Sequence, residues 1–453
     1  MVGFSRCMKK LSLFLLLVAF ACVVSAEETN APAWLSRPLS QADCLNIALA
    51  QNADILKAQS DLEASAGVVV QTRAVALPTL QATGKYTDTE KSLLQTPPGF
   101  SYPVPEQNWN SGIQLVQGIY EGGKLIAAVQ AASATKKQAI AQYQTQVADT
   151  LLSVRLAYYD VLLAAQQITV NEASVKLLQK ELDDQQRRFD AGTVPHFNVL
   201  RAEVALANAK PDLFHATSQY RISKNLLANL LGYNLPRDVL ENIPLNLTDT
   251  FDITPWNVIL PDAIQQALER RTELTDLREQ VVLQNLNIVN AKSGYKPTIQ
   301  AFAGYNWQNS GFSTDVADEI NGWNAGGQLT WAIFDGALTI GKVQQAKALY
   351  KKSQTELEDR SRQIELDVRT AYSDFLEAKE VLDSQTKVQE QAEEALREAN
   401  ARFDAGTGTQ LDVLDAETSL TQARTTQVQA LHDYATARAR LERSIGAEFA
   451  PAK

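Results

Sequence analysis

The most constraining feature of this chain is a six-residue sequence that occurs twice. Arg-Phe-Asp-Ala-Gly-Thr spans residues 188–193 and again residues 402–407, 214 positions later in a chain of 453 residues. At the same offset, 114–231 align with 328–445 without a gap, and an offset of 219 continues the match upstream. Self-similarity over such a length indicates that one structural unit is built twice.

The N-terminus has the pattern of a secretory signal. Arg6, Lys9 and Lys10 precede a mostly apolar run over 11–24, and small residues end at Ala26 before an acidic start. The run is shorter than the roughly 20 residues of a membrane-spanning helix, so we expect 1–26 to be a cleaved signal peptide. A lipoprotein signal ending at Cys22 is the alternative, although the usual aliphatic residue three positions earlier is missing.

The remainder divides into two repeats and a connection. We expect a first repeat at 27–232, a crossover at 233–260, a second repeat at 261–446 and a tail at 447–453. The crossover is irregular because it is rich in proline, with Pro236, Pro244, Pro255 and, at its end, Pro261.

Composition excludes several functions. Without the signal, 39 Lys plus Arg stand against 52 Asp plus Glu, a formal net charge of −13, which argues against nucleic acid as a partner. Only Cys44 remains, so no intrachain disulfide can form, and a buried apolar role is expected for it. The histidines, His196, His215 and His432, lack metal-ligand spacing. With no nucleophile–base pair, metal cluster or phosphate loop, we expect no enzyme, no cofactor and no metal.

Each repeat contains one very long helix. Residues 123–190 and 337–404 each run 68 positions without proline and are rich in Ala, Gln, Leu and charged residues. At 1.5 Å per residue, such a helix is on the order of 100 Å long. Apolar residues at Val154, Tyr158 and Val161 follow the alternating spacing of a coiled-coil seam. A rod is therefore expected.

Shorter helices flank the long ones. They are expected at 41–75 and 197–231 in the first repeat, and at 261–294 and 411–445 in the second. Two short helices stacked end to end would match one long helix in length, whereas a side-by-side bundle is the alternative. Gly192 and Gly406 follow the long helices, where a helix end favours a left-handed residue, so each marks a hairpin tip.

Four strands are expected at about 79–88, 109–120, 298–307 and 323–334. Apolar and polar residues alternate along them, and aromatic residues lie near their ends. Strands of about ten residues suit an outer-membrane barrel, but a soluble four-stranded sheet on a core has the same periodicity. Four strands cannot close in lipid without unpaired edges, so a transmembrane sheet would require an oligomer.

These features together resemble the TolC family of outer-membrane efflux proteins. The resemblance rests on the duplicated order, on Leu-Pro-Thr at 77–79 and Lys-Pro-Thr at 296–298, on Tyr-Glu-Gly-Gly at 120–123 and on the two hexapeptides. It implies a mainly α protein with a β-barrel part, which would be a homotrimer with a 12-stranded barrel in outer-membrane lipid and an α-helical tunnel in the periplasm of a Gram-negative bacterium. Its function would be that of a passive exit duct for efflux or type I secretion, joined by a periplasmic adaptor to an inner-membrane transporter.

In that family the hairpin tips contact the adaptor and close the tunnel. By resemblance, the contacts here would come from residues of both hexapeptides, namely Phe189, Ala191, Gly192, Thr193, Ala405, Gly406 and Thr407. Small residues would let an adaptor approach closely, and the threonines offer hydroxyls. The glycines could equally serve only to end the helices.

The resemblance also implies a charge filter at Asp412 and Asp415, which match the acidic pair lining the family's aperture. Without the resemblance, acidic residues in the first turn of a helix would be explained by their favourable interaction with the helix dipole. The best-known member also closes its tips with a tyrosine and an arginine bonded to an acid and a threonine. This chain has Phe403, Gly408, Asn198 and Phe197 there, so that polar latch is missing and we expect apolar packing of Phe197 and Phe403.

A second function class remains open from the sequence. The same helices and strands could form a soluble periplasmic coiled-coil scaffold or adaptor whose sheet packs on its own helices. Cell fractionation separates the two: an oligomer that only detergent extracts from the outer membrane supports the duct, and a soluble periplasmic monomer supports the scaffold.

Overall fold

The structure is a computed structural model, and it describes residues 33–94, 105–233, 243–251, 254–311, 313 and 315–447. The predicted signal peptide at 1–26, with Cys22, lies outside the described residues. So does the predicted tail beyond residue 447. Parts of the predicted crossover, 234–242 and 252–253, are also outside them.

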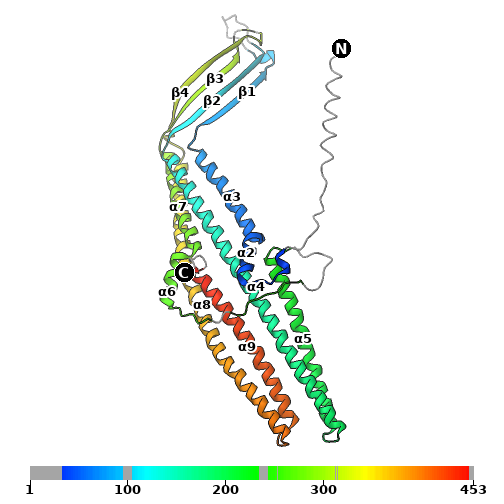
Figure 1. Ribbon diagram of the computed structural model, residues 1–453. Helices are drawn as coiled ribbons and strands as arrows, with labels where there is room; N and C mark the ends of the chain where they lie inside the picture. The colour runs from blue at the N-terminus through cyan, green and yellow to red at the C-terminus, as the bar shows by residue number, and fades with distance from the viewer. Residues whose placement is uncertain are drawn as a thin grey trace, which may run out of the picture.

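Two long helices form the axis of a rod, as predicted (Figure 1). Helix α4 covers Lys124–Asp190 and α8 covers Leu338–Asp404, 67 residues each. Each begins one residue later than predicted, because Gly123 and Ala337 adopt left-handed conformations that turn the chain from sheet to helix. The predicted seam residues Val154, Tyr158 and Val161 are buried.

The shorter helices are stacked end to end along the long ones, not bundled side by side. Towards the sheet, α4 packs against α3 (Ala53–Ala74), and towards the tip it packs against α5 (His196–Leu230). In the second repeat, α8 packs against α7 (Thr272–Lys292) and then α9 (Gln410–Ile445). The stacked arrangement is therefore confirmed (Figure 1).

The sheet-proximal short helices are not continuous, which corrects the predicted helices at 41–75 and 261–294. Helix α2 (Gln41–Gln51) ends before Asn52, and α6 (Leu260–Arg270) ends before Arg271. Both break residues have extended backbones, with ψ of 130° and 120°. Short η helices are found at Ala33–Ser36, Lys91–Leu93 and Ser293–Tyr295.

At each break, the side chain of the extended residue hydrogen-bonds to the helix stacked next in line, α5 for Asn52 and α9 for Arg271. Asn52 Nδ2 donates to the Leu230 carbonyl at 2.7 Å, and Arg271 Nη1 donates to the Ser444 carbonyl at 3.3 Å. The break residues are 219 positions apart and the acceptors 214 apart, so the two contacts are equivalent in the repeat. The break is thus a duplicated feature of the junction between stacked helices.

The four strands form one antiparallel sheet in the order β1-β2-β3-β4. They cover Thr79–Asp88, Gln107–Glu121, Thr298–Asn309 and Glu319–Thr330. Within the described residues, β1 and β4 have no further strand partner, and the sheet extends beyond the end of the rod (Figure 1). The predicted fourth strand ran to residue 334, which is wrong because the pairing ends at Thr298 opposite Thr330. Pro297 precedes that pair and has no N–H with which to extend the ladder.

The strand register collects apolar residues on one face of the sheet. One cross-strand row joins Ala82, Ile113, Tyr305 and Trp323, and the next joins Leu80, Leu115, Ala303 and Ala325. The opposite face carries polar side chains, among which Asn306 donates to Asn324 at 3.2 Å. No other described part of the chain covers the apolar face, and Trp323 is 79% exposed.

The largest core cluster lies midway along the rod. The crossover contributes Leu245 and Phe251 to it, and Leu39 pairs with Leu247 in an isolated bridge. Cys44 is a free, fully buried thiol in this cluster, as expected for a small apolar residue. Among the described residues, no helix is both long enough and apolar enough to cross a membrane.

Candidate functional site at the hairpin tips

The two hexapeptides form the two hairpin tips and share one backbone geometry. Gly192 and Gly406 have φ of +70° and +72°, a region that favours glycine over residues with a Cβ. The following threonine donates its N–H to the arginine carbonyl that opens each hexapeptide, at 2.9 Å in both tips. The glycine therefore ends the long helix and starts the return of the chain.

The predicted adaptor-contact residues lie at the surface of these turns. Six of them lie in the turns, and all six are exposed: Ala191, Gly192, Thr193, Ala405, Gly406 and Thr407. The Phe189 ring packs against His196, with centroids 5.1 Å apart. The threonine hydroxyls donate to helix-end carbonyls of their own tips, at 2.8 and 3.2 Å. They therefore remain available to a partner chiefly as hydrogen-bond acceptors.

Arg188 joins the two tips of the protomer, a contact that the sequence analysis missed. Its guanidinium donates to Asp404 Oδ1 at 2.9 Å and lies 4.8 Å from the centroid of the Phe403 ring. The equivalent residue in the second repeat, Arg402, instead pairs with Glu398 of its own helix. Identical residues at equivalent positions thus have different roles.

Asp412 and Asp415 are both exposed in the first turns of α9. Asp412 belongs to a capping box: its Oδ2 accepts from the Thr409 N–H at 2.8 Å, and its own N–H donates to Thr409 Oγ1 at 3.3 Å. These hydrogen bonds from Thr409 hold the pKa of Asp412 below its usual range. The dipole and capping role of Asp412 is therefore established by its contacts, and it leaves the carboxylate charged at the tip.

Phe197 and Phe403 do not belong to one cluster within the protomer. Phe403 is half-buried and packs against the tip core of Leu396, Val413 and Leu420. The Phe197 side chain is 67% exposed. Their predicted packing against each other would therefore need a neighbouring copy of the chain.

The family of this chain follows from its similarity to known proteins. The family model described as "Outer membrane efflux protein" matches residues 44–233 and 263–447, which together are more than half of the chain. The chain belongs to the outer membrane efflux protein family. It is similar to the outer membrane protein TolC of Vibrio cholerae, at 25% identity over 415 residues, 89% of this chain and 90% of the relative. TolC of Escherichia coli is 24% identical over 87% of this chain and 80% of its own length.

The fold of this outer membrane efflux protein also matches solved channel structures. The outer membrane channel CmeC of Campylobacter jejuni has a TM-score of 0.78 at 16% identity, covering 91% of this chain and 87% of its own. The mainly α fold with a small sheet is thus confirmed. The protein is an outer-membrane efflux channel component and not the soluble periplasmic scaffold that the sequence left open.

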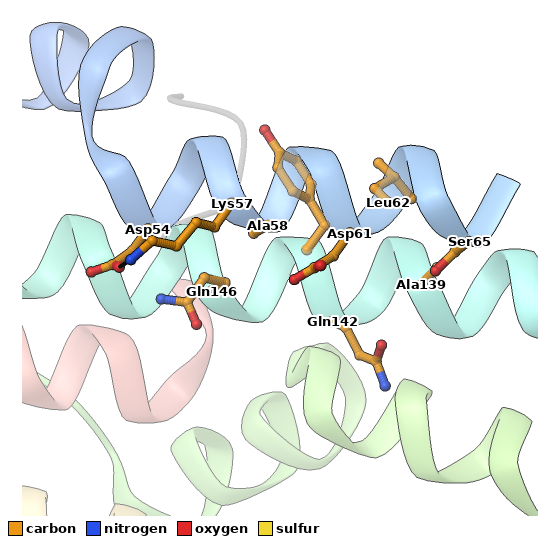
Figure 2. A pocket seen from close by; sticks show the side chains of 10 residues that line it. Asp54, Lys57, Ala58, Asp61, Leu62, Ser65, Ala139, Gln142 and Gln146 are labelled. Carbon is orange, nitrogen blue, oxygen red and sulfur yellow. Dashed lines mark hydrogen bonds and ion pairs between the residues drawn. The ribbon is translucent and has the colours of Figure 1, made fainter. Parts of the chain in front are cut away.

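One pocket of the efflux protein lies away from the tips, between α3 and α4 (Figure 2). Its walls carry both polar and apolar side chains, and Lys57, which lines it, pairs with Asp54 at 3.1 Å. None of the site residues predicted from the sequence lines it. Within the described ranges, no group of three or more His, Cys, Asp or Glu side chains is placed to hold a metal ion.

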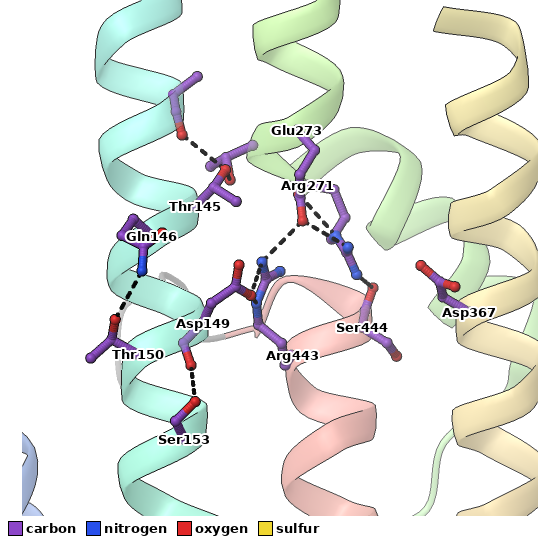
Figure 3. Close-up of polar contacts among 12 residues, drawn as sticks. Thr145, Gln146, Asp149, Thr150, Ser153, Arg271, Glu273, Asp367, Arg443 and Ser444 are labelled. Carbon is purple, nitrogen blue, oxygen red and sulfur yellow. Dashed lines mark hydrogen bonds and ion pairs between the residues drawn. The ribbon is translucent and has the colours of Figure 1, made fainter. Parts of the chain in front are cut away.

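An ionic network lies where α6 and α7 meet α4 and α9 (Figure 3), and all its members except Asp149 are buried or nearly so. Glu273 accepts from Arg271 at 2.7 Å and from Arg443 at 2.9 Å, and Arg443 also pairs with Asp149 at 2.7 Å. Burial opposes ionisation of Glu273, but the hydrogen bond from Arg271 and the charges of both arginines outweigh it and lower its pKa to about 2. The network ties three helices of the efflux protein at mid-rod.

Proposed function

We propose that three copies of this chain form a passive exit duct. Each copy would contribute four strands to a 12-stranded barrel in outer-membrane lipid and two helical hairpins to a periplasmic tunnel. The duct has no catalytic role in this proposal: it provides a path, and energy comes from an inner-membrane transporter reached through a periplasmic adaptor.

The observation that carries the proposal is the uncovered amphipathic sheet. Its apolar face, with Trp323 and Leu80, is exposed although the chain has a 67-residue helix on which it could have packed. In the described residues β1 and β4 have free edges, which lipid tolerates only when the sheet closes. Neighbouring copies supply that closure, with the polar face lining the lumen.

Three copies suit the sheet better than two. Two copies would give eight strands, and the interior of an eight-stranded barrel is filled by its own side chains. Three copies give twelve strands and room for a path. The helices would continue the threefold arrangement into the periplasm, because each long helix and the short helices stacked along it run away from the sheet as one rod (Figure 1). Three such rods would form the tunnel wall.

The tips fit the role of an adaptor-binding end. Both are exposed, both present small residues at the turn, and both have one backbone geometry. An adaptor hairpin that recognises one tip would therefore find a similar surface on the other. Site-specific photo-crosslinkers at Thr193 and Thr407 should capture the adaptor in cells, whereas the same group at exposed Lys351, near the sheet end of α8, should not.

Fractionation tests the duct itself. A heat-modifiable oligomer that only detergent extracts from the outer membrane, with an apparent mass of about three chains on cross-linking, is the expected result. A soluble periplasmic monomer would refute the duct, and a stable dimer would refute the twelve-stranded barrel.

The aperture proposal assigns the charge filter to Asp412 and Asp415, with Phe197 and Phe403 packing between neighbouring hairpins. Six carboxylates near one axis would favour cations in the path. Single-channel recordings in planar bilayers should show lower cation selectivity and weaker block by multivalent cations for the double variant D412A/D415A. Unchanged selectivity and block would remove the filter from the mechanism.

A further inference from the structure

A cluster of four oxygen-bearing side chains, three buried and one half-buried, lies between α4 and α9 near the tips. Glu181 and Gln185 come from α4, and Gln410 and Glu417 come from α9. Gln185 is fully buried, and the exposures of Gln410 and Glu417 are only 5% and 4%. The hydrogen bonds that form the tip turns do not involve these four side chains.

The hydrogen bonds of the cluster converge on one carboxylate. Gln185 Nε2 donates to Glu181 Oε1 at 2.9 Å, and Gln410 Nε2 approaches the same oxygen at 3.5 Å. Gln410 Nε2 also donates to the Asn198 carbonyl at 3.1 Å. The amide nitrogens of both glutamines are thereby engaged, and their Oε1 atoms remain as acceptors.

Three buried oxygens in this cluster lack a hydrogen-bond donor. They are Gln185 Oε1, Gln410 Oε1 and Glu417 Oε2, each shielded from solvent. A buried oxygen without a donor is costly, and here all three belong to residues that contact Glu181 or feel its charge. One proton on Glu417 could satisfy its own oxygen and one acceptor, which leaves a third oxygen without a partner.

The electrostatic surroundings are negative. Burial raises the pKa of Glu417 to about 7, and the charge of Glu181 adds to that shift. Burial also raises the pKa of Glu181, where Asp184 adds to the effect and the amides and Arg188 oppose it. Arg188 is itself engaged by Asp404, and the adjoining tip core is apolar. The one positive charge that acts on Glu181 here is thus shared with Asp404, and it does not offset both carboxylates of the cluster.

We propose that this cluster is a binding site for one hard divalent cation, such as Ca²⁺, in each protomer. Two carboxylates would balance its charge, and the two amide oxygens belong to the ligand class that Ca²⁺ prefers. The bound cation would cross-link α4 to α9, and so tie the two hairpins of one protomer together beside the Arg188 contact. The site is distinct from the exposed Asp412 and Asp415, and it does not depend on which cargo or adaptor the duct serves.

The internal repeat supplies a sequence signal for this site. Glu417 has an identical counterpart, Glu203, at the offset of 214, but Glu203 is exposed on α5. The counterparts of the other three members differ in type: Ala395 for Glu181, Ala399 for Gln185 and His196 for Gln410. The oxygen ligands therefore accumulate at only one of the two equivalent places.

Terbium luminescence on the full-length oligomer in detergent tests the proposal. Tb³⁺ replaces Ca²⁺ in oxygen sites, and comparing its decay lifetime in water and in deuterium oxide reports how many waters it binds. A D412N/D415N background removes the two exposed acids proposed for the charge filter. In that background we expect a poorly hydrated Tb³⁺ site, one per protomer, from which Ca²⁺ displaces Tb³⁺. Affinity should fall as the pH is lowered, because carboxylate ligands must be deprotonated to bind the cation.

Variants assign the site to its residues. E417Q should weaken binding on the order of tenfold or more, because one of the two charged ligands is lost, and E181Q should do the same. E203Q, the equivalent change at an exposed position, should bind like the parent. Heat modifiability on gels checks that each variant is folded and assembled. If the parent holds only highly hydrated Tb³⁺, or if E417Q binds as tightly as E203Q, the proposal is wrong and a proton alone occupies the cluster.

Discussion

The substitution E273Q should weaken the mid-rod network of Figure 3 by a predictable amount. The Glu273 side chain is only 15% exposed, and both its oxygens accept from Arg271 while Arg443 adds a third contact. Its pKa falls from 4.5 to about 2. At about 1.4 kcal/mol per pKa unit, the ionised carboxylate contributes roughly 3 kcal/mol to the stability of each protomer at neutral pH. That value agrees with the cost of about 3–5 kcal/mol for removing one partner from a buried ion pair.

The pH dependence gives the sharper test. A lowered carboxylate pKa contributes stability that is fully present above pH 4.5 and is lost as the pH falls towards 2. The difference in Tm between the parent and E273Q should therefore be largest at neutral pH and shrink between pH 4.5 and 2. Differential scanning calorimetry at one scan rate on the detergent-solubilised oligomer measures it. E269Q is the matched control, because exposed Glu269 on the preceding helix only accepts from Gln265.

Two results would refute this reasoning. If E273Q melts with the parent at pH 7, the network contributes no net stability and the two arginines are satisfied without it. If the difference in Tm is the same at pH 7 and pH 3, the loss comes from packing and not from the charge of Glu273.

Three further predictions concern other parts of the rod. R188A should raise the frequency of channel opening in planar bilayers several-fold, because it removes the exposed ion pair with Asp404 and the cation–π contact with Phe403, together worth roughly 1 kcal/mol. R402A is the control: Arg402 pairs within its own helix, so opening should be unchanged. N52A should destabilise the protomer by about 2 kcal/mol in thermal unfolding, because a helix cap is lost and the half-buried Leu230 carbonyl loses its donor. A variant as stable as the parent would contradict this. Burial lowers the pKa of His432, but its hydrogen bonds to Asp160 and Asp433 outweigh burial and raise the pKa above 6.5. H432Q should therefore be less stable than the parent at pH 6, and this difference in stability should disappear as the pH rises through the raised pKa of His432.

Much of this fold could be predicted because its strongest signals are local. A run of 68 residues without proline predicts each long helix, and 67 of those residues are helical in each repeat. Two-residue alternation identified the sheet, and the observed register places the predicted apolar residues in shared cross-strand rows. The helix breaks at Asn52 and Arg271 were missed because neither residue is a helix breaker by type. Their extended backbones depend on carbonyls of α5 and α9, more than 170 positions away.

The tip residues were easier to locate than to interpret. The repeated hexapeptide identified the turns, but it assigns the same letters to Arg188 and Arg402, which have different partners. Thr193 and Thr407 looked like free hydroxyls, yet both donate to their own helix ends. Partners across 200 or more positions are a property of the packed tips, and no local pattern contains them.

The comparison of equivalent positions suggests how the two hairpins divide their work. Backbone features are duplicated: the tip turns, the helix breaks and the contacts at the stacked junctions occur in both repeats. Charges are not duplicated, since Asn198 and Arg201 stand in α5 where α9 has Asp412 and Asp415. In a trimer, three acidic α8–α9 tips would therefore alternate with three α4–α5 tips that carry a basic residue at the matching place. Attraction between unlike neighbours favours a closed ring, and within each protomer Arg188 and the buried oxygen cluster hold the same two hairpins together. We expect opening of such a duct to separate α9 from α4, and in that case these contacts between hairpins, and not the duplicated turns, would oppose it.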